Sequence, residues 1–95
     1  MDTTSKDKFS LGQCVATPGA LEALQEAGQS AHEFLAQHAG GDWGEVSKDD
    51  AVENELSLEQ GFRILSAYRT RKGRRLWVIT EADRSSTTIL LPEEY

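Results

Sequence analysis

The chain has 95 residues, a formal net charge of −6 at pH 7 and a hydrophobic share of 38%. This length predicts one domain with one modest core, and the acidic balance argues against general nucleic-acid binding. The single cysteine, Cys14, cannot form an internal disulfide, and no apolar run approaches the roughly 20 residues of a membrane span. The N-terminus lacks the apolar segment of a signal peptide, so we expect a cytoplasmic protein.

The N-terminal part of the chain predicts a short tail followed by a strand. Met1 to Lys8 is polar and terminal, and we expect it to be disordered, so that residues 9–95 form a single domain. Phe9 to Ala16 (FSLGQCVA) is a strand candidate that could add to an edge of the sheet, although Gly12 weakens it. A cysteine in such a strand is expected to be a small core residue.

Two helices are predicted next, each with its own start signal. Thr17 suits an N-cap and Pro18 suits the first helical position, while Gly28 supplies the stop. Ser30 starts the second helix, and Glu33, three residues later, completes a capping box.

A loop with a large aromatic residue and a third helix follow. Trp43 is costly to expose, so we expect it to fill the core beneath its loop. Ser47 caps the third helix and Gly61 ends it. The apolar positions of this helix, chiefly Val52 and Leu56, form only a thin stripe.

Most large apolar side chains lie in residues 62–91, which read as three antiparallel strands. Phe62 to Thr70 alternates with a period of two, and Leu76 to Thr80 is β-branched and aromatic. Thr87 to Leu91 resumes the pattern, and Pro92 ends it because proline cannot donate to a ladder.

The order of these elements predicts the fold class. It is α+β, with three N-terminal helices packed on a three- to four-stranded antiparallel sheet whose C-terminal part is a β-meander. A two-residue turn at Lys72-Gly73 would place Tyr68 directly opposite Trp77 as a cross-strand aromatic pair.

Charge is distributed unevenly along the chain. The acidic face consists of Asp42, Glu45, Asp49, Asp50, Glu53, Glu55 and Glu59, and the basic hairpin consists of Arg69, Arg71, Lys72, Arg74 and Arg75. Both are candidate partner-binding surfaces, and both could equally be solvated surfaces that partly pair with each other. The acidic face could compete for a nucleic-acid-binding surface of a partner, and the basic hairpin could contact phosphate.

The loop at residues 80–87 is the strongest candidate for chemistry. It holds Glu81, Asp83 and Arg84 together with four hydroxyl side chains. One interpretation is a loop held by side-chain-to-backbone hydrogen bonds. The alternative is a toxin-like ribonuclease in which Glu81 and Arg84 act as an acid/base pair, with His38 or Arg63 nearby and the basic hairpin steadying phosphate.

No cofactor or metal site is predicted, and no catalytic motif stands out. His32 and His38 are six residues apart, which is not the i, i+4 spacing of helical metal ligands. Cys14 would need a neighbouring base and a lowered pKa to act as a nucleophile.

The chain from Leu11 onward resembles a family of short bacterial proteins labelled plasmid-related or hypothetical, some of which carry a restriction-subunit label. The stretches that carry the resemblance are VATPGALEALQEAGQS, EFLAQH with GDWGEV, RILSAYRT and LWVITEADRSSTTILLPEEY. The unusually basic tip RTRKGRR departs from it. The resemblance implies accessory cargo of plasmids, phages and integrative elements, and it supplies no catalytic residues.

Together these features predict a small acidic protein that binds another protein and does not act as an enzyme. In the context that the resemblance implies, it would inhibit a host anti-DNA defence system of the anti-CRISPR or anti-restriction type. The partner would be a nucleic-acid-binding defence complex rather than nucleic acid itself or a membrane, and the protein would be a monomer or a homodimer. The alternative is the toxin-like ribonuclease.

Overall fold

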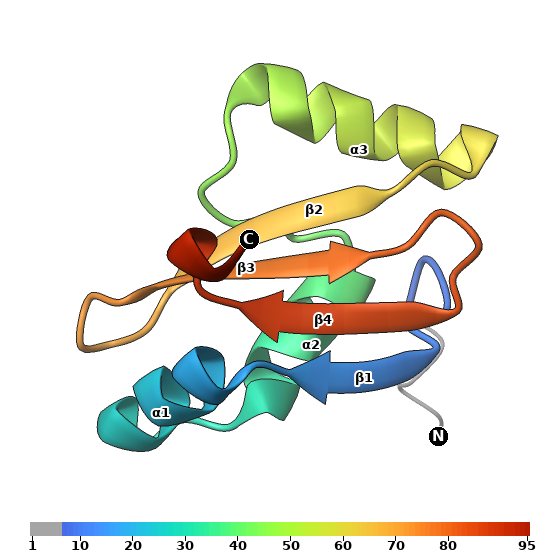
Figure 1. The fold of residues 1–95 in the computed structure, drawn as a ribbon. Coiled ribbons are helices and arrows are strands. Elements are labelled where there is room, and N and C mark those ends of the chain that lie inside the picture. The colour runs from blue at the N-terminus through green and yellow to red at the C-terminus, as the bar shows by residue number, and fades with distance from the viewer. Residues whose placement is uncertain (1–6) are drawn as a thin grey trace, which may run out of the picture.

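The computed structural model describes residues 7–95, so most of the tail expected to be disordered lies outside the described residues. The elements in chain order are β1 (Gln13–Ala16), α1 (Pro18–Ala27), α2 (Ala31–Ala39), α3 (Lys48–Gln60), β2 (Ile64–Arg69), β3 (Arg75–Thr80), β4 (Ser86–Leu90) and the short 3-10 helix η2 (Pro92–Glu94). Figure 1 shows α2 behind the sheet and α3 beside its β2 edge. The α+β class is confirmed.

The sheet has four strands in the order β1-β4-β3-β2, and it is mixed rather than antiparallel. The predicted β2–β3–β4 meander is antiparallel throughout, but β1 pairs with β4 in parallel. One strand therefore precedes the helices, and the expectation of a purely antiparallel sheet is wrong for β1. A four-residue strand carries no pattern that fixes its direction, so the sequence could not reveal this pairing.

The helix boundaries follow the predicted capping residues. The hydroxyl oxygen of Thr17 accepts a hydrogen bond from the backbone N–H of Ala20, and Gly28 ends α1 with φ of 64°. Ser30 caps α2 as predicted, but the predicted capping box with Glu33 is wrong in both halves. The Ser30 hydroxyl accepts from the His32 N–H, and the Glu33 carboxylate accepts from the side-chain amide of Gln29.

The β2–β3 hairpin has a three-residue loop instead of the predicted two-residue turn. The Thr70 N–H donates to the Arg74 carbonyl at 2.8 Å, and Gly73 adopts φ of 87°. Type I turns followed by a left-handed residue are common in such loops. The extra loop residue shifts the register by one, so Tyr68 lies opposite Leu76, and Trp77 lies opposite Ala67.

The predicted Tyr68–Trp77 pair is therefore wrong, and the two rings lie on opposite faces of the sheet. Tyr68 faces α2, where its ring centroid is 5.5 Å from that of Phe34. Trp77 faces away from α2, and its ring packs edge-on against Tyr95 at 5.6 Å. A slip of one residue sends each side chain to the other face, because side chains alternate along a strand.

The main core lies between the sheet and the helices α1 and α2. Its buried members are Ala20, Ala23, Leu24, Phe34, Tyr68, Leu76, Val78, Ile89 and Leu91. Trp43 is buried as predicted, with its ring beside those of Phe9 and His38. Cys14 is exposed on the edge strand β1, so the expectation that it is a core residue is wrong.

The helix α3 lies along the outer edge of β2 and covers no face of the sheet (Figure 1). The side-chain amide of Asn54 donates to the Leu65 carbonyl at 2.8 Å and accepts from the Leu65 N–H at 3.2 Å. Next to it, the Ala67 N–H donates to the Trp43 carbonyl and the Ala67 carbonyl accepts from the Glu45 N–H. These four bonds close the β2 edge.

Candidate functional site

Three of the seven residues of the predicted acidic face are engaged within the molecule. The Asp42 carboxylate accepts from the Gln37 side chain and from the Gly44 N–H. Glu45 forms an ion pair with Arg69 at 3.1 Å. Glu55 accepts from the indole N–H of Trp43 at 3.0 Å. These three acids stabilise the loop before α3 and the start of the hairpin.

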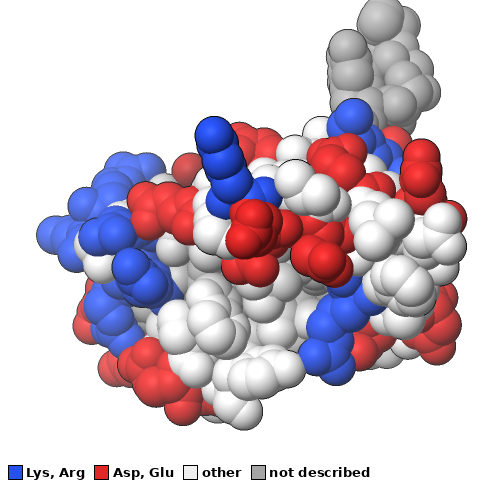
Figure 2. Space-filling view, turned by 90° about the horizontal axis from the view of Figure 1, so that it is seen from above, with Lys and Arg blue, Asp and Glu red and all other residues white. Residues whose placement is uncertain are grey.

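The other four acids of this face all lie on α3. They are Asp49, Asp50, Glu53 and Glu59, all of them exposed. Among the described residues, none of the four forms an ion pair. Figure 2, which looks down on the molecule from the side of α3, shows acidic side chains gathered on this surface. The structure thus separates four available acids from three that are already in use.

Two exposed aliphatic side chains lie among these acids. Val52 is 68% exposed and Leu56 is 42% exposed, and their i, i+4 spacing puts them on one side of α3. They line a shallow groove of about 390 Å³ together with Glu55, Leu58 and Glu59. The stripe that looked like a core stripe in the sequence instead faces solvent, because α3 contacts the sheet through Asn54 and Ser57.

A second groove lies between α3 and β2. Its volume is about 360 Å³. Its lining combines carboxylates, apolar surface and one guanidinium, from Asp50, Glu53, Asn54, Ser57, Phe62, Arg63 and Leu65. The ring of Phe62 is half exposed, so the groove offers an aromatic surface beside two of the available acids.

The basic hairpin is partly neutralised by ion pairs. Arg69 pairs with Glu45, and Arg74 pairs with Glu26 at 3.4 Å. Arg71, Lys72 and Arg75 form no ion pair within the described residues. In Figure 2 the largest group of basic side chains lies at the left end of the molecule, and further basic side chains stand among the acidic ones. The two predicted binding faces therefore meet at the Glu45–Arg69 ion pair, and their remaining charges lie on separate parts of the surface.

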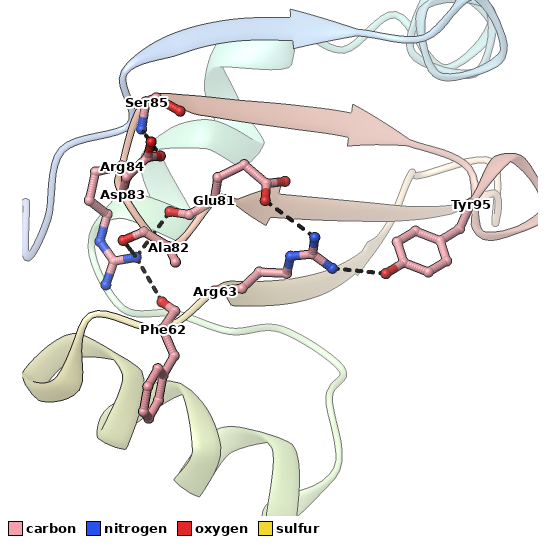
Figure 3. A network of polar contacts seen from close by, with 8 residues as sticks. All are labelled: Phe62, Arg63, Glu81, Ala82, Asp83, Arg84, Ser85 and Tyr95. Atoms are coloured by element: carbon pink, nitrogen blue, oxygen red, sulfur yellow. Dashed lines mark hydrogen bonds and ion pairs between the residues drawn. The ribbon is translucent and has the colours of Figure 1, made fainter.

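Arg84 holds together the turn between β3 and β4 and the end of α3 (Figure 3). Its guanidinium donates to the carbonyls of Phe62 at 2.7 Å, Ser57 at 2.9 Å, Glu81 at 3.1 Å and Ala82 at 3.2 Å. Within residues 7–95, Arg84 is also the one non-glycine residue with positive φ, at 61°. The side chain thus caps the C-terminal carbonyls of α3 and the turn at once.

The acids of this turn make separate contacts. The Glu81 carboxylate accepts from the Arg63 guanidinium at 3.2 Å, and Arg63 also donates to the Tyr95 hydroxyl at 2.9 Å (Figure 3). Asp83 accepts from the Ser85 N–H at 3.0 Å, and its hydrogen bonds with Ser85 lower the pKa of its carboxyl. Glu81 and Arg84 are neighbours, but their charged groups bind different partners.

Sequence reasoning missed a buried chain of polar side chains centred on His38. The imidazole Nε2 of His38 is 2.9 Å from the Thr80 hydroxyl, and its Nδ1 contacts the Ser66 hydroxyl. The Thr80 hydroxyl is 2.7 Å from that of Thr87, which donates to the Leu11 carbonyl at 2.7 Å. The only signal was that His38 shares a helix side with Phe34 and Leu35.

The proton positions along this chain follow from counting donors. The Leu11 carbonyl can only accept, so the single hydroxyl proton of Thr87 points toward it, and Thr80 must donate to Thr87. Thr80 then accepts from His38 Nε2–H, which leaves Nδ1 to accept from Ser66. His38 is thus the neutral Nε2–H tautomer, satisfied at both nitrogens. Burial, and secondarily the charge of Arg84, lower its pKa to about 4.

Neither a metal site nor a membrane span occurs within residues 7–95. No group of three or more His, Cys, Asp or Glu side chains there could hold a metal ion. No helix in this range is long and apolar enough to cross a membrane. Comparison with protein-family models, curated proteins and solved structures gives no match to this chain.

Proposed function

We propose that the protein works by binding a basic surface of another protein through α3, without catalysing a reaction. The observation that carries this proposal is the position of α3 at the sheet edge. A helix of 13 residues buries only Asn54 and Ser57 and leaves an aliphatic pair and four acids exposed. An exposed apolar pair inside a charged rim is the arrangement of a protein–protein contact, where apolar groups give affinity and charges guide association.

The charge of this surface suits a particular kind of partner. A partner that normally binds nucleic acid carries a basic patch, and the acids of α3 would compete with phosphate for it. In the mobile-DNA context that the resemblance implies, such partners include CRISPR complexes and restriction enzymes. We therefore propose inhibition of a host anti-DNA defence system as the biological role.

The test uses two pairs of charge reversals with equal effect on net charge. Glu53→Lys with Glu59→Lys changes the available acids of α3, whereas Glu22→Lys with Glu93→Lys changes exposed acids on α1 and η2. Each pair takes the net charge from −6 to −2, because every Glu→Lys change adds two units. Both leave Glu55 in place, since its contact with Trp43 supports the fold.

Tagged wild-type and variant proteins would be incubated with lysate of a bacterial host at low and at moderate salt. We expect the wild type and the control pair to retain one stoichiometric nuclease or CRISPR subunit that is released as salt rises. The α3 pair should lose that partner. Equal retention by the two pairs would show that α3 is not the binding surface.

The ribonuclease alternative receives less support from the geometry. An acid/base pair must be free to reach its substrate, whereas Glu81 binds Arg63 and the Arg84 guanidinium binds four backbone carbonyls. A binding inhibitor should be harmless when expressed alone and visible only when its target system is present. Toxicity on expression that Glu81→Gln abolishes would instead favour the enzyme.

A further inference from the structure

The two edge strands of the sheet differ in how far their outward backbone groups are hydrogen-bonded. The β2 edge is closed by Asn54 and by the segment 43–45, as described above. The opposite edge is β1, at the bottom of the sheet in Figure 1, and its residues Gln13, Cys14 and Val15 are exposed. An open edge presents unpaired backbone groups that can pair with another strand, and proteins usually protect such edges.

The ladder with β4 shows which backbone groups of β1 are unused. The N–H of Gln13 donates to the Ser85 carbonyl and that of Thr17 donates to the Ile89 carbonyl, both at 3.0 Å. Alternate residues of a strand point their backbone groups to the same side, so Gln13, Val15 and Thr17 face β4. The N–H and carbonyl groups of Cys14 and Ala16 therefore face outward.

Charged side chains and proline, which often protect an edge, are absent from this one within residues 9–17, and only the short length of β1 limits its exposure. Residues 9–21 contain no Asp, Glu, Lys or Arg, and the strand itself contains no proline. Beside the edge, on the face covered by α1 and α2, lies an apolar groove of about 260 Å³. It is lined by Cys14, Val15, Ala16, Leu21, Ala31, Leu35 and Ile89, and Leu21 is 54% exposed.

We propose that two copies of this chain pair through β1 as antiparallel strands, which joins the two sheets into one. Two copies of a chain of net charge −6 repel each other at long range, and this uncharged edge lets them approach without opposing like charges. The edge is also self-complementary, because the outward N–H and carbonyl groups of Cys14 and Ala16 can each bond their counterparts in an antiparallel second copy.

The backbone fixes one register for this pairing. With Val15 opposite Val15 of the second copy, Cys14 of each copy faces Ala16 of the other, and all outward N–H and carbonyl groups are bonded. A register centred on Cys14 would need Gly12, whose φ is 65°, and one centred on Ala16 would need Pro18, which has no N–H. The chosen register also brings the two apolar grooves together, because the helices of both copies lie on the same face.

Engineered cysteines test both the pairing and its register. Directly opposed residues at such a non-hydrogen-bonded position have Cα atoms about 4.5 Å apart, which a disulfide can span. In a Cys14→Ser background, Val15→Cys should cross-link under mild oxidation at least about tenfold faster than Gln13→Cys, because pairing raises the effective thiol concentration. Gln13 is the matched control: it is exposed on the same strand face, but its partner in this register is Thr17.

The mass of the unmodified protein provides the second measurement. Sedimentation or light scattering over a concentration series should show a dimer, and Val15→Lys should shift it to monomer with an unchanged circular-dichroism spectrum. A protein that stays monomeric at all concentrations would overturn the proposal. So would cross-linking of Gln13→Cys as fast as that of Val15→Cys. Neither result bears on binding through α3, which lies at the other sheet edge.

Discussion

The side-chain amide of Asn54 takes the place of a neighbouring strand at Leu65. It donates to the backbone carbonyl and accepts from the backbone N–H of that residue, as an adjacent strand would. One side chain thus fixes α3 to the sheet and bonds both outward backbone groups of Leu65 on the β2 edge. The outward side of α3 is left free for other contacts as a result.

Replacement of Asn54 by Ala should lower the free energy of unfolding by about 2 kcal/mol, because two hydrogen bonds to a partly buried backbone are lost. Asn54→Asp should be at least as destabilising, since a carboxylate cannot donate to the Leu65 carbonyl. Urea unfolding at neutral pH would measure both. The exposed neighbour Gln60→Ala serves as the control and should change stability by less than about 0.5 kcal/mol. A loss equally small for Asn54→Ala would contradict the role of this contact.

Stability should depend on pH through His38. The pKa of His38 is about 4 in the folded protein, whereas the ordinary value of 6.5 applies to the unfolded chain. The unfolded chain therefore takes up the proton first as the pH falls. The contribution of neutral His38 to the free energy of unfolding is therefore complete above pH 6.5 and is lost progressively down to pH 4. The shift corresponds to about 3 kcal/mol at most.

Urea unfolding between neutral and acid pH would measure this dependence, and NMR titration of the imidazole would report the pKa directly. The lowered carboxyl pKa values of Asp83 and Glu94 act in the same direction at lower pH. Comparison with His38→Gln isolates the histidine, because the slope between pH 6.5 and 4 should flatten in that variant. An unchanged slope would show that His38 is not the group responsible.

Replacement of Arg84 should destabilise the turn and the end of α3 together. Arg84→Ala should cost roughly 2 kcal/mol, because four carbonyls lose a charged donor. Arg84→Lys should recover little of this, since an ammonium group lacks the planar fork that reaches several acceptors. Arg84→Gly should be less damaging than Arg84→Ala by about 1 kcal/mol, because glycine adopts the positive φ without strain. Thermal unfolding of the three variants would check this order.

The Glu55 carboxylate should matter for folding rather than for binding. Glu55→Ala removes the acceptor of the Trp43 indole and should lower stability by about 1 kcal/mol. The emission of Trp43 should shift to the red, which is best followed with Trp77→Phe to leave one indole. Glu55→Gln retains an oxygen acceptor and should recover most of the stability. If Glu55→Ala abolished partner capture while leaving stability and emission unchanged, Glu55 would belong to the binding surface.

Local signals made the helices and the meander predictable. Thr17, Ser47 and the terminal glycines act within one turn of the chain, so their effect is visible in the sequence. The hairpin register was not predictable, because Gly73 suits both a two-residue and a three-residue loop, and the alternation of residues 62–70 does not say which face is covered.

The candidate site was less predictable than the fold. Val52 and Leu56 have the spacing of a core stripe, and only the contact between Asn54 and Leu65 shows that α3 turns them outward. The partners of His38 come from β2 and β3, which lie 28 and 42 residues away. Such contacts depend on tertiary packing, and no local pattern encodes them.

The strand order β1-β4-β3-β2 has a consequence for how the chain is made. The strand synthesised first pairs only with β4, the last strand in the described sequence. On the ribosome, β1 must therefore wait without its partner until almost the whole domain has emerged, while the local β2–β3 hairpin can form earlier. Because β1 and β4 are far apart in the sequence, their pairing should form more slowly than the helices do. Until β4 has been synthesised, the uncharged strand β1 can pair with other nascent chains.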